Sequence, residues 1–548
     1  MRVALLSNVT VDLLADMVKK TNSVYISAGF DTWQQEIVMH TSGLYEYNPE
    51  AVVILLHADA YEWTDKNLGF SIIDEWCMAF KELTDNLPGV PVFISSIDVN
   101  IKCHYGAEIR FEEQIENHLI ECVQNLHDAG ASIYILPVKD AITDMGRRSF
   151  YSDKMWYIGS MPYSIKGLST LSALIGRYIS AAKGMRKKCI AVDLDNTLWG
   201  GVIGEDRVEG ISLSSHKEGA QYYDTQKILK KMKEQGVMLA ILSKNNVEDV
   251  EPVFRHPNMI LRHKDFAAES INWESKTVNI RKLAKDLNIG LDAFVFLDDN
   301  PAEREQMKAE CPEVAVIDFP KDSSLLPDTV EQAYNDYFLC LEVTGEDTKK
   351  TEMYRAESLR KAEMSAAASV DDFLKNLEMV MTVHRMLPEE KKRVTQLVNK
   401  TNQFNVTTRR YSEEEIKSLA ENGDIITVHM ADKYGDQGLV AVMILKYEKE
   451  EAEIDTFLMS CRVMGRKAEE EIAARVKKYL KKKDVKKIRA SYIKTAKNTP
   501  VLKLFDKLGF THISGEIRKD GDCKDYLAET DALPVTSGVF KEVSEDWS

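Results

Sequence analysis

The strongest constraint in the sequence is a short apolar run that ends in two aspartates. Residues 189–192 are all hydrophobic, and Asp193 and Asp195 follow with one residue between them. Such a run is typical of a buried strand in a parallel sheet, and open α/β sheets bind ligands where these strands end. Because burying unpaired charge is unfavourable, the two carboxylates need a cation, and their hard oxygen atoms suit Mg²⁺. An aspartate nucleophile that forms an aspartyl-phosphate is one of the few chemistries that fits.

The order Asp-x-Asp-x-Thr at residues 193–197 resembles the first motif of the haloacid dehalogenase-like phosphatases. The remaining motifs of that superfamily follow at suitable spacing. A second apolar run ends in Ser243, whose hydroxyl and following backbone N–H groups could hold phosphate oxygens. Lys276 opens a helix-like stretch and could place a fixed cation over the phosphate. A third apolar run ends in Asp298, which supplies the further carboxylate that Mg²⁺ needs.

The resemblance implies a role for each of these residues. Asp193 would attack a phosphoryl group, and Asp195 would act as general acid and base. Mg²⁺ would be held by Asp193, the backbone carbonyl of Asp195 and Asp298, while Ser243 and Lys276 would hold the phosphate. Supporting positions in this region are Thr197, Asn245 and Asp299. The plain alternative is that all of these are ordinary turn residues of an α/β domain.

Two longer strings narrow the resemblance. Residues 193–206 and 296–304 are similar to the FkbH-like branch of the superfamily. Its members load a glyceryl unit from a phosphorylated acyl donor onto a carrier protein in polyketide biosynthesis. The resemblance therefore implies a bifunctional glyceryl transferase and phosphatase, with 1,3-bisphosphoglycerate as donor and a phosphopantetheinylated acyl carrier protein as acceptor. Two alternatives stay open: a magnesium-dependent phosphatase of a small sugar or acid phosphate with non-catalytic flanking domains, and a carrier-binding module without acyl transfer.

Length and composition bound the class of protein. A chain of 548 residues is too long for one core, so about three domains are expected. The net charge of −16 argues against broad nucleic-acid binding, which needs a basic surface. No leader and no membrane-spanning run is evident, and the eight cysteines form no Cys-x-x-Cys pair. We therefore expect a cytoplasmic protein with free thiols and no contact with membranes.

The order of apolar runs predicts a multidomain α/β chain. The expected parts are an α/β domain at 1–184, a Rossmann-like phosphatase domain at 185–340, a connecting helix at 341–377, an α+β domain at 378–530 and a frayed tail at 531–548. The first part resembles the N-terminal domain of FkbH-like proteins, which implies an SGNH-hydrolase-like fold. In the first domain Ser7 stands where that hydrolase fold keeps its nucleophile, but Trp156 replaces the usual histidine. A serine without a base is a weak nucleophile, so this domain is expected to recognise or dock rather than catalyse.

The α+β domain resembles the GCN5-related acyltransferase fold. Residues 499–510 match its late helix and turn, and residues 462–468 resemble its pyrophosphate loop, although Lys467 replaces the last small residue. Cys461 precedes this loop and is expected at the mouth of a helix, where the helix N-terminus and Arg462 would lower the pKa of a thiol. The string 460–466 is similar to the acyl-accepting segment of FkbH-like proteins, which implies a Cys461 thioester. The alternative is a buried structural cysteine.

Three further positions could support Cys461. Asn402 lies in an amide-rich segment that could line the acyl site, although an ordinary capping loop explains it almost as well. His429 and Asp436 are possible bases for the thiol, and a structural role is the alternative for both. The basic run at 475–489 is either a docking face for an acidic carrier protein or a solvated helix face.

Overall fold

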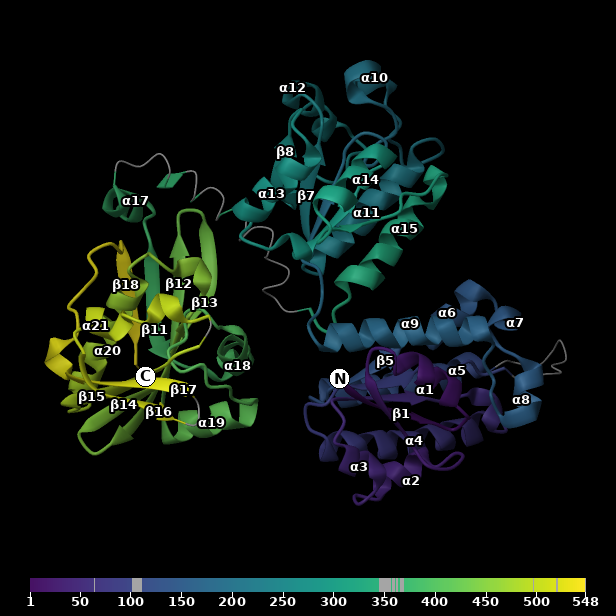
Figure 1. The fold of residues 1–548 in the computed structure, drawn as a ribbon, viewed down its shortest axis with the longest axis horizontal. Coiled ribbons are helices and arrows are strands. Elements are labelled where there is room, and N and C mark those ends of the chain that lie inside the picture. The colour runs from purple at the N-terminus through teal and green to yellow at the C-terminus, as the bar shows by residue number, and fades with distance from the viewer. Residues whose placement is uncertain are drawn as a thin grey trace. The chain divides into compact units, whose positions relative to one another are not determined.

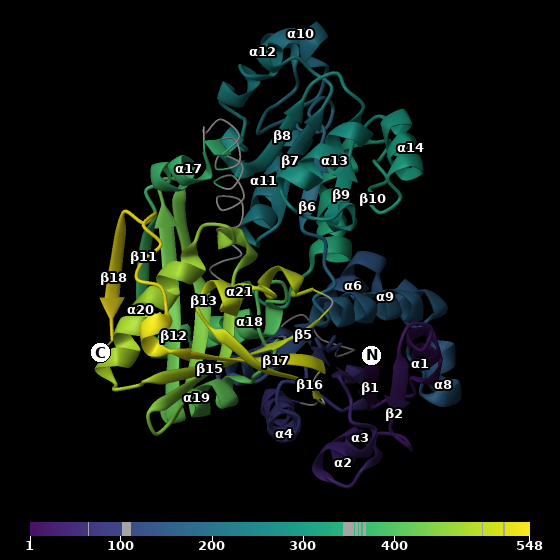
Figure 2. The ribbon, with the colours of Figure 1, turned by 60° about the vertical axis from the view of Figure 1, so that its left-hand side comes forward.

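The computed structural model describes residues 1–547 except 64, 101–110, 344–355, 357–359, 361, 362, 365–368, 496, 519 and 520. Its strands form three sheets, two of five strands and one of eight, which follow one another along the chain (Figure 1). Figure 2 shows the same elements from another side. Helices accompany every sheet, so the α/β multidomain class predicted from the sequence is confirmed.

The first sheet is parallel, with the strand order β2-β1-β3-β4-β5. Its strands are β1 (Arg2–Ser7), β2 (Ser23–Ile26), β3 (Ala51–Leu55), β4 (Val92–Ser95) and β5 (Ile133–Leu136). The helices are α1 (Asp12–Val18), α2 (Trp33–Val38), α3 (Gly43–Tyr47), α4 (Lys66–Asn86), α5 (Glu112–Asp128), α6 (Val138–Met145), α7 (Arg147–Phe150), α8 (Asp153–Gly159) and α9 (Ile165–Ala182).

Two hydrophobic cores explain why β3 is apolar at every position. Along β3, Val52 and Ile54 pack with α2–α5, whereas Val53 and Leu55 pack with α1, α6 and α9 on the other face. Successive side chains of a strand point to opposite faces, so a sheet covered on both faces needs continuous apolar runs. Strand β2 was missed because its residues are only half-buried and its sequence carries no such run.

The prediction that all cysteines are free thiols is wrong for one pair. Cys77 on α4 and Cys122 on α5 form a disulfide whose Cα atoms lie 6.2 Å apart. The two residues are 45 positions apart in the sequence, and only the packing of α4 against α5 brings them together. Spacing in the sequence could not reveal this pair because it forms no local motif.

Ser7 is not placed as an exposed nucleophile. Its hydroxyl donates to the carbonyl of Leu55 at 2.7 Å and accepts from the N–H of Val9 at 3.2 Å, and the residue is buried. Trp156, which replaces the usual histidine, packs with its ring 5.2 Å from the ring of His57. The Ser7 hydroxyl is thus engaged by backbone groups of its own sheet, and the non-catalytic role of this domain stays a prediction.

His57 gives the first sheet a pH-dependent stability. Burial, followed by the positive charge of Arg147, lowers the pKa of its imidazole from 6.5 to about 4. Between these values the unfolded chain binds more protons than the folded one, so stability falls as the pH falls through that window. We expect His57→Asn to remove a loss of up to about 3 kcal/mol. Hydrogen–deuterium exchange of β3 peptides at pH 7 and pH 5, corrected for intrinsic exchange, measures the difference.

The exposed His40 supplies the control for this measurement, because its side chain is 57% exposed. His40→Asn should keep the pH dependence of the wild type. An unchanged pH dependence in His57→Asn would show that the folded chain tolerates the charged imidazole.

The second sheet has the order β10-β9-β6-β7-β8. Its strands are β6 (Cys189–Val192), β7 (Met238–Ser243), β8 (Phe266–Ile271), β9 (Phe294–Leu297) and β10 (Ala315–Val316). The helices are α10 (Ile203–Gly210), α11 (Ala220–Glu234), α12 (Val247–Val250), α13 (Lys276–Asp286), α14 (Pro301–Glu310) and α15 (Leu326–Ala333). This order is that of a doubly wound Rossmann-like sheet, in which the direction of winding reverses between β6 and β9.

The third sheet is mixed, with the order β16-β17-β15-β14-β13-β12-β11-β18. Its strands are β11 (Val380–Arg385), β12 (Gly423–Asp432), β13 (Gly435–Glu448), β14 (Glu451–Met459), β15 (Lys487–Ile493), β16 (Thr511–Arg518), β17 (Gly521–Glu529) and β18 (Glu542–Asp546). The helices are α17 (Val370–Asn376), α18 (Lys391–Lys400), α19 (Glu413–Asn422), α20 (Ala468–Lys482) and α21 (Leu504–Lys507). Helices α18 and α19 pack on one face of the sheet, and α17, α20 and α21 on the other.

The segment around Val406 lies between two strands of this sheet that separate. Strands β14 and β15 pair in parallel only as far as Ile454 and Ala490. Beyond that point the N–H of Val406 donates to Phe457 at 3.1 Å, and its carbonyl accepts from Ile493 at 2.9 Å. The main chain of this segment therefore satisfies backbone groups that the two strands no longer offer each other.

The tail predicted to be frayed instead adds a strand. Residues 542–546 form β18, which pairs in parallel with β11, and Val543 packs on the core of the third sheet. Val543 is the one apolar residue of this strand, and a single apolar residue among polar neighbours is too weak a signal to predict a strand. The predicted connecting helix at 341–377 lies largely outside the described residues, apart from α17 near its end.

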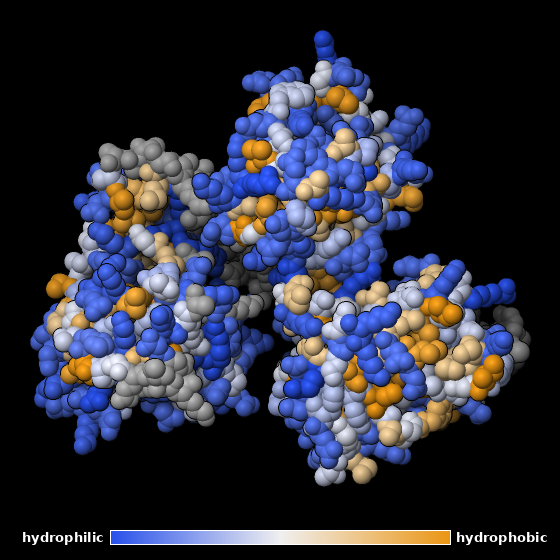
Figure 3. All heavy atoms as spheres, viewed as in Figure 1, coloured by the Kyte–Doolittle hydropathy of each residue, from blue (hydrophilic) through white to orange (hydrophobic). Residues whose placement is uncertain are grey.

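The face of the molecule in Figure 3 is mostly hydrophilic. Figure 3 shows hydrophilic residues over most of this face, with hydrophobic residues more frequent over the first sheet and its helices. Within the described ranges, no helix combines the length and the apolar character needed to cross a membrane.

Candidate functional site

Two neighbouring strands of the second sheet place the carboxylates of the site. Asp193 follows β6 and Asp298 follows β9, and the two strands pair in parallel with Val192 opposite Leu297. The N–H of Asp193 donates to the carbonyl of Leu297 at 3.0 Å, which fixes the two strand ends side by side. The winding of the sheet reverses between these strands, and ligands of open α/β sheets bind at such a point.

Three carboxylates converge there. Asp193, Asp298 and Asp299 each offer an oxygen, and these atoms all lie within 4.8 Å of one another. Asp193 is 7% exposed and Asp298 is fully buried. Carboxylates this close in a buried site repel each other unless a cation lies among them, and an all-oxygen set suits a hard divalent ion such as Mg²⁺. Asp299, predicted only as a supporting residue, thus belongs to the possible metal ligands.

The loop after β9 is fixed by its own hydrogen bonds. A carboxylate oxygen of Asp298 accepts from the N–H of Asn300 at 2.9 Å, and Asn300 caps the first turn of α14. Arg304 donates to the carbonyls of Asp298 and Asp299 at 2.8 and 2.7 Å. Sequence reasoning missed this role of Arg304, although the residue closes the string 296–304. These hydrogen bonds fix the main chain of Asp298 and Asp299, and one carboxylate oxygen of Asp298, at the end of β9.

Asp195 has a different environment. One oxygen of its carboxyl accepts from the Trp199 indole at 2.9 Å and from the N–H of Ile203 at 3.0 Å, and the other accepts from Asn245 at 3.0 Å. Burial raises the pKa of Asp195, and these three hydrogen bonds oppose the rise. A carboxyl that holds a proton more readily than usual suits a general acid. The carboxyl of Asp195 is thus held by these hydrogen bonds and is not part of the three-carboxylate cluster. The predicted contact of Asp195 with the metal is through its backbone carbonyl.

The other predicted residues lie in the expected elements. Ser243 is the last residue of β7, the neighbour of β6 in the sheet, and it is buried. Lys276 is the first residue of α13 and is only 3% exposed, which is rare for lysine unless it is paired. Thr197 is fully buried, and its hydroxyl has no hydrogen-bond partner within the part of the chain that the structure describes. That hydroxyl is therefore available to a bound ligand.

The insert between the first two motifs is a short flap, as its length predicts. Its one helix, α10, bends at Arg207, and the carboxyl of Asp206 accepts from the N–H of Val202 at 2.8 Å. Gly200 and Ser212 pair across the base of the flap. No separate cap domain forms between Trp199 and Tyr222.

Comparisons with known proteins concern the domain that contains these residues. A scan against protein-family models and a search of curated proteins found no match. Among solved structures, the chain is similar to the N-terminal part of the protein BF1531 from Bacteroides fragilis, which contains a phosphatase domain and was crystallised with Mg. The identity is 27% and the TM-score 0.57, over 63% of this chain and 94% of that one. This chain contains a phosphatase-type domain.

Weaker similarities involve acetyltransferases. The ribosomal-protein-S18-alanine N-acetyltransferase from Escherichia coli matches 27% of this chain and 94% of its own, at 14% identity and a TM-score of 0.23. A spermidine N-acetyltransferase from Vibrio cholerae, solved with CoA and spermine, matches 28% of this chain and 96% of its own, also at 14% identity and 0.23.

Cys461 is not at the start of a helix, contrary to the prediction. It begins a 3₁₀ turn, Cys461–Val463, directly after β14, and α20 starts only at Ala468. Gly465 and Lys467 adopt positive φ angles between the turn and the helix, so the chain reverses before the helix forms. The side chain of Cys461 lies outside the described part of the structure. Arg462 donates to the Ser460 hydroxyl at 3.2 Å.

The amide-rich segment lies beside the strand that leads to Cys461. The N–H of Met459 donates to the carbonyl of Phe404 at 3.0 Å, which places the segment against the end of β14. Asn402 accepts a hydrogen bond from Arg410. This contact stabilises the loop and is what the capping-loop interpretation predicts. Asp436 accepts from the N–H of Gly438 at 2.7 Å near the start of β13, so its carboxylate stabilises this end of the β12–β13 hairpin.

The basic run at 475–489 does not form an unneutralised patch. Acidic groups of the same domain pair with most of its cations: Arg475 and Lys478 with Glu545, Lys481 with Asp531, Lys483 with Asp424 and Lys486 with Glu450. These contacts favour the solvated-face interpretation over a docking face for a carrier protein.

Proposed function

We propose that this chain is a magnesium-dependent phosphatase combined with an acyltransferase, which loads a glyceryl unit from 1,3-bisphosphoglycerate onto an acyl carrier protein. The observation that carries the proposal is the convergence of Asp193, Asp298 and Asp299 at the switch point of a phosphatase-type sheet. The Mg found in the similar Bacteroides fragilis phosphatase domain supports this choice of ion. The glyceryl unit and the carrier protein come from the FkbH-like resemblance of the sequence.

In the phosphatase step, a carboxylate oxygen of Asp193 attacks phosphorus and forms an aspartyl-phosphate. The bond from phosphorus to the substrate oxygen breaks, and Asp195 gives that oxygen a proton. Asp195 then takes a proton from water as the water attacks phosphorus, which releases phosphate and restores Asp193. Mg²⁺ held by Asp193, Asp298, Asp299 and the backbone carbonyl of Asp195 would supply charge neutralisation for the phosphate oxygens. Ser243, Lys276 and the unpaired hydroxyl of Thr197 would orient the phosphate.

In the transfer step, the Cys461 thiolate attacks the carbonyl carbon of the acyl phosphate, and inorganic phosphate leaves. The thioester then passes the acyl group to the thiol of the carrier's phosphopantetheine arm, and the Cys461 thiol is regenerated. The acetyltransferase-like order of the domain at 378–530 and the position of Cys461 after β14 support this assignment. His429 contacts Glu390 at 2.6 Å, so it is not assigned to this step.

A direct assay separates this proposal from its main alternative. We expect the full chain to release phosphate from 3-phosphoglyceryl-pantetheine faster than from free 3-phosphoglycerate, because the favoured substrate is a thioester. Removing divalent ions with EDTA should lower the rate at least about 100-fold, and Mg²⁺ should restore it. Faster release from the free acid would favour a phosphatase of small acid phosphates. Release that EDTA leaves intact would contradict the metal assignment.

A further inference from the structure

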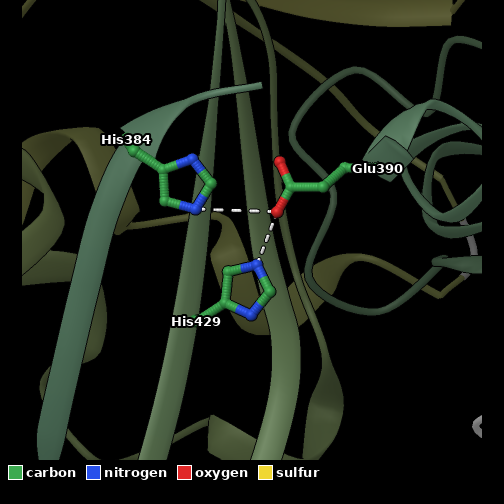
Figure 4. A group of neighbouring side chains, drawn as sticks. All are labelled: His384, Glu390 and His429. Atoms are coloured by element: carbon green, nitrogen blue, oxygen red, sulfur yellow. Dashed lines mark hydrogen bonds and ion pairs between the residues drawn. The ribbon is translucent and has the colours of Figure 1, made fainter. Parts of the chain in front are cut away.

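A second group of possible metal ligands lies in the third sheet, apart from the residues that the proposed function uses for Mg²⁺. His384 on β11, His429 on β12 and Glu390 in the turn before α18 offer ligand atoms that all lie within 4.8 Å of one another. Figure 4 shows that each imidazole turns one nitrogen toward the same oxygen of Glu390. Three side chains from three elements thus meet at one point.

The strand register explains this convergence. Strands β11 and β12 are antiparallel, with Thr382 opposite His429 and His384 opposite Thr427. The two histidines therefore occupy diagonal positions on the same face, and their rings stack with centroids 5.4 Å apart and planes 18° apart. Glu390 reaches the two histidines from the turn Pro388–Glu390, so the group consists of two residues of the sheet and one residue of an adjacent turn.

The hydrogen bonds leave acceptor atoms facing each other. The Nδ1 atom of His384 lies 2.9 Å from the carbonyl of Arg385. Because a carbonyl can only accept, Nδ1 carries the proton of the neutral ring, and Nε2 keeps a lone pair. That Nε2 lies 3.6 Å from Oε1 of Glu390, which is itself an acceptor. Two such atoms repel unless a cation binds them both, either a second proton on the ring or a metal ion.

The surroundings hold Glu390 in place for such a role. Its Oε2 accepts from the N–H of Leu387 at 3.0 Å and from the hydroxyl of Thr427 at 3.0 Å. Its Oε1 is left to face the two histidines, with Nε2 of His429 at 2.6 Å. Outer hydrogen bonds that orient both a histidine and a carboxylate are characteristic of metal sites. The side chains of His384 and Glu390 are about one-tenth exposed, whereas that of His429 is 38% exposed.

We propose that His384, Glu390 and His429 bind Zn²⁺ through Nε2, Oε1 and Nε2. Two imidazoles and one carboxylate suit zinc, whereas Mg²⁺ prefers oxygen ligands alone. Tetrahedral bonds of about 2.1 Å separate neighbouring ligand atoms by roughly 3.4 Å. The 3.6 Å between His384 and Glu390 already fits this value, and the 2.6 Å between His429 and Glu390 must open by roughly 0.8 Å. The exposed ring of His429 has the room to turn.

Three protein ligands would leave a fourth position of a tetrahedral zinc site for another ligand. Zinc sites of this composition bind water or a substrate oxygen there, whereas structural zinc sites are closed by four protein ligands. The ligand class of the open position is therefore water or a carbonyl oxygen.

Zinc binding to the full chain tests the proposal. The protein is stripped with EDTA, dialysed and titrated with Zn²⁺ alone by calorimetry, and Co²⁺ is then bound in its place to record the visible absorption of a tetrahedral site. Because the three-aspartate cluster could also take zinc, the titrations are made in an Asp193→Asn background. We expect one tight site, weakened at least about 100-fold by His384→Gln or His429→Gln, with loss of the Co²⁺ bands.

Two further variants separate binding from folding. His512→Gln changes a histidine of the same sheet outside the cluster, on β16, and should leave zinc affinity unchanged. Glu390→Gln keeps the shape of the side chain but removes the carboxylate charge, and should weaken zinc while the circular dichroism of the chain stays the same. Zinc affinity that is equal in the Asp193→Asn background and in its His384→Gln derivative would overturn the proposal and leave a proton-linked His–Glu pair.

Discussion

Replacing Asp193 with asparagine should reduce phosphate release by at least about 10³-fold, because the amide oxygen is a far weaker nucleophile than the carboxylate. The variant also removes one charge from the cluster of Asp193, Asp298 and Asp299. Residue 193 keeps its backbone hydrogen bond to Leu297, so the fold of the second sheet should be retained. Phosphate release from 3-phosphoglyceryl-pantetheine in saturating Mg²⁺ measures the effect.

A comparison with Asp298→Asn distinguishes the nucleophile from a metal ligand. Asp298 is assigned to the metal alone, so its loss should be partly rescued by raising the Mg²⁺ concentration, whereas Asp193→Asn should not respond. Asp224→Asn, which changes an exposed aspartate paired with Lys227, serves as the surface control and should retain full activity. Phosphate release by Asp193→Asn at the wild-type rate would remove Asp193 from the mechanism.

Replacing Cys461 with alanine should eliminate the covalent acyl-enzyme. After incubation with 1,3-bisphosphoglycerate, the intact mass of the wild type should increase by one phosphoglyceryl or glyceryl unit, and that of Cys461→Ala should not. Because alanine has no nucleophilic atom, acyl transfer to the carrier should fall at least about 10³-fold. Phosphate release from a ready-made phosphoglyceryl thioester should persist, since that step is assigned to Asp193.

Cys340→Ala provides the matched control, because Cys340 is a half-buried free cysteine outside the third sheet. It should form the same adduct as the wild type. An adduct that survives in Cys461→Ala would locate the acyl group on another residue. Phosphate release without an adduct in either protein would favour the simple phosphatase, with the flanking domains as scaffolds.

The phosphatase site is the part that the sequence describes best. Asp193, Ser243 and Asp298 stand at the ends of apolar runs and Lys276 opens a helix, and such positions are encoded locally. Asp193 and Asp298 meet because their runs become adjacent parallel strands, and Asn245 contacts Asp195 as a supporting residue should. The roles of these residues stay predictions until the variants are measured.

The prediction for Cys461 is less complete, and the reason is physical. The sequence shows a cysteine between an apolar run and a helix. It does not show how many residues the chain uses to reverse its direction before the helix begins. The 3₁₀ turn and the positive φ angles at Gly465 and Lys467 delay the helix until Ala468. A helix dipole acts within its first turn, so it cannot be invoked for a thiol seven residues earlier in the chain.

By itself the sequence determined the buried strands that are continuous apolar runs, such as β3, β6 and β9, and the acidic residues that follow β6 and β9, because both depend on neighbours within a few positions. Tertiary structure alone decided which distant residues meet. The Cys77–Cys122 disulfide needs the packing of α4 on α5, strand β18 needs the edge of β11, and the meeting of His384, Glu390 and His429 needs the register of β11 and β12. These contacts join positions whose spacing carries no period, so only the folded chain reveals them.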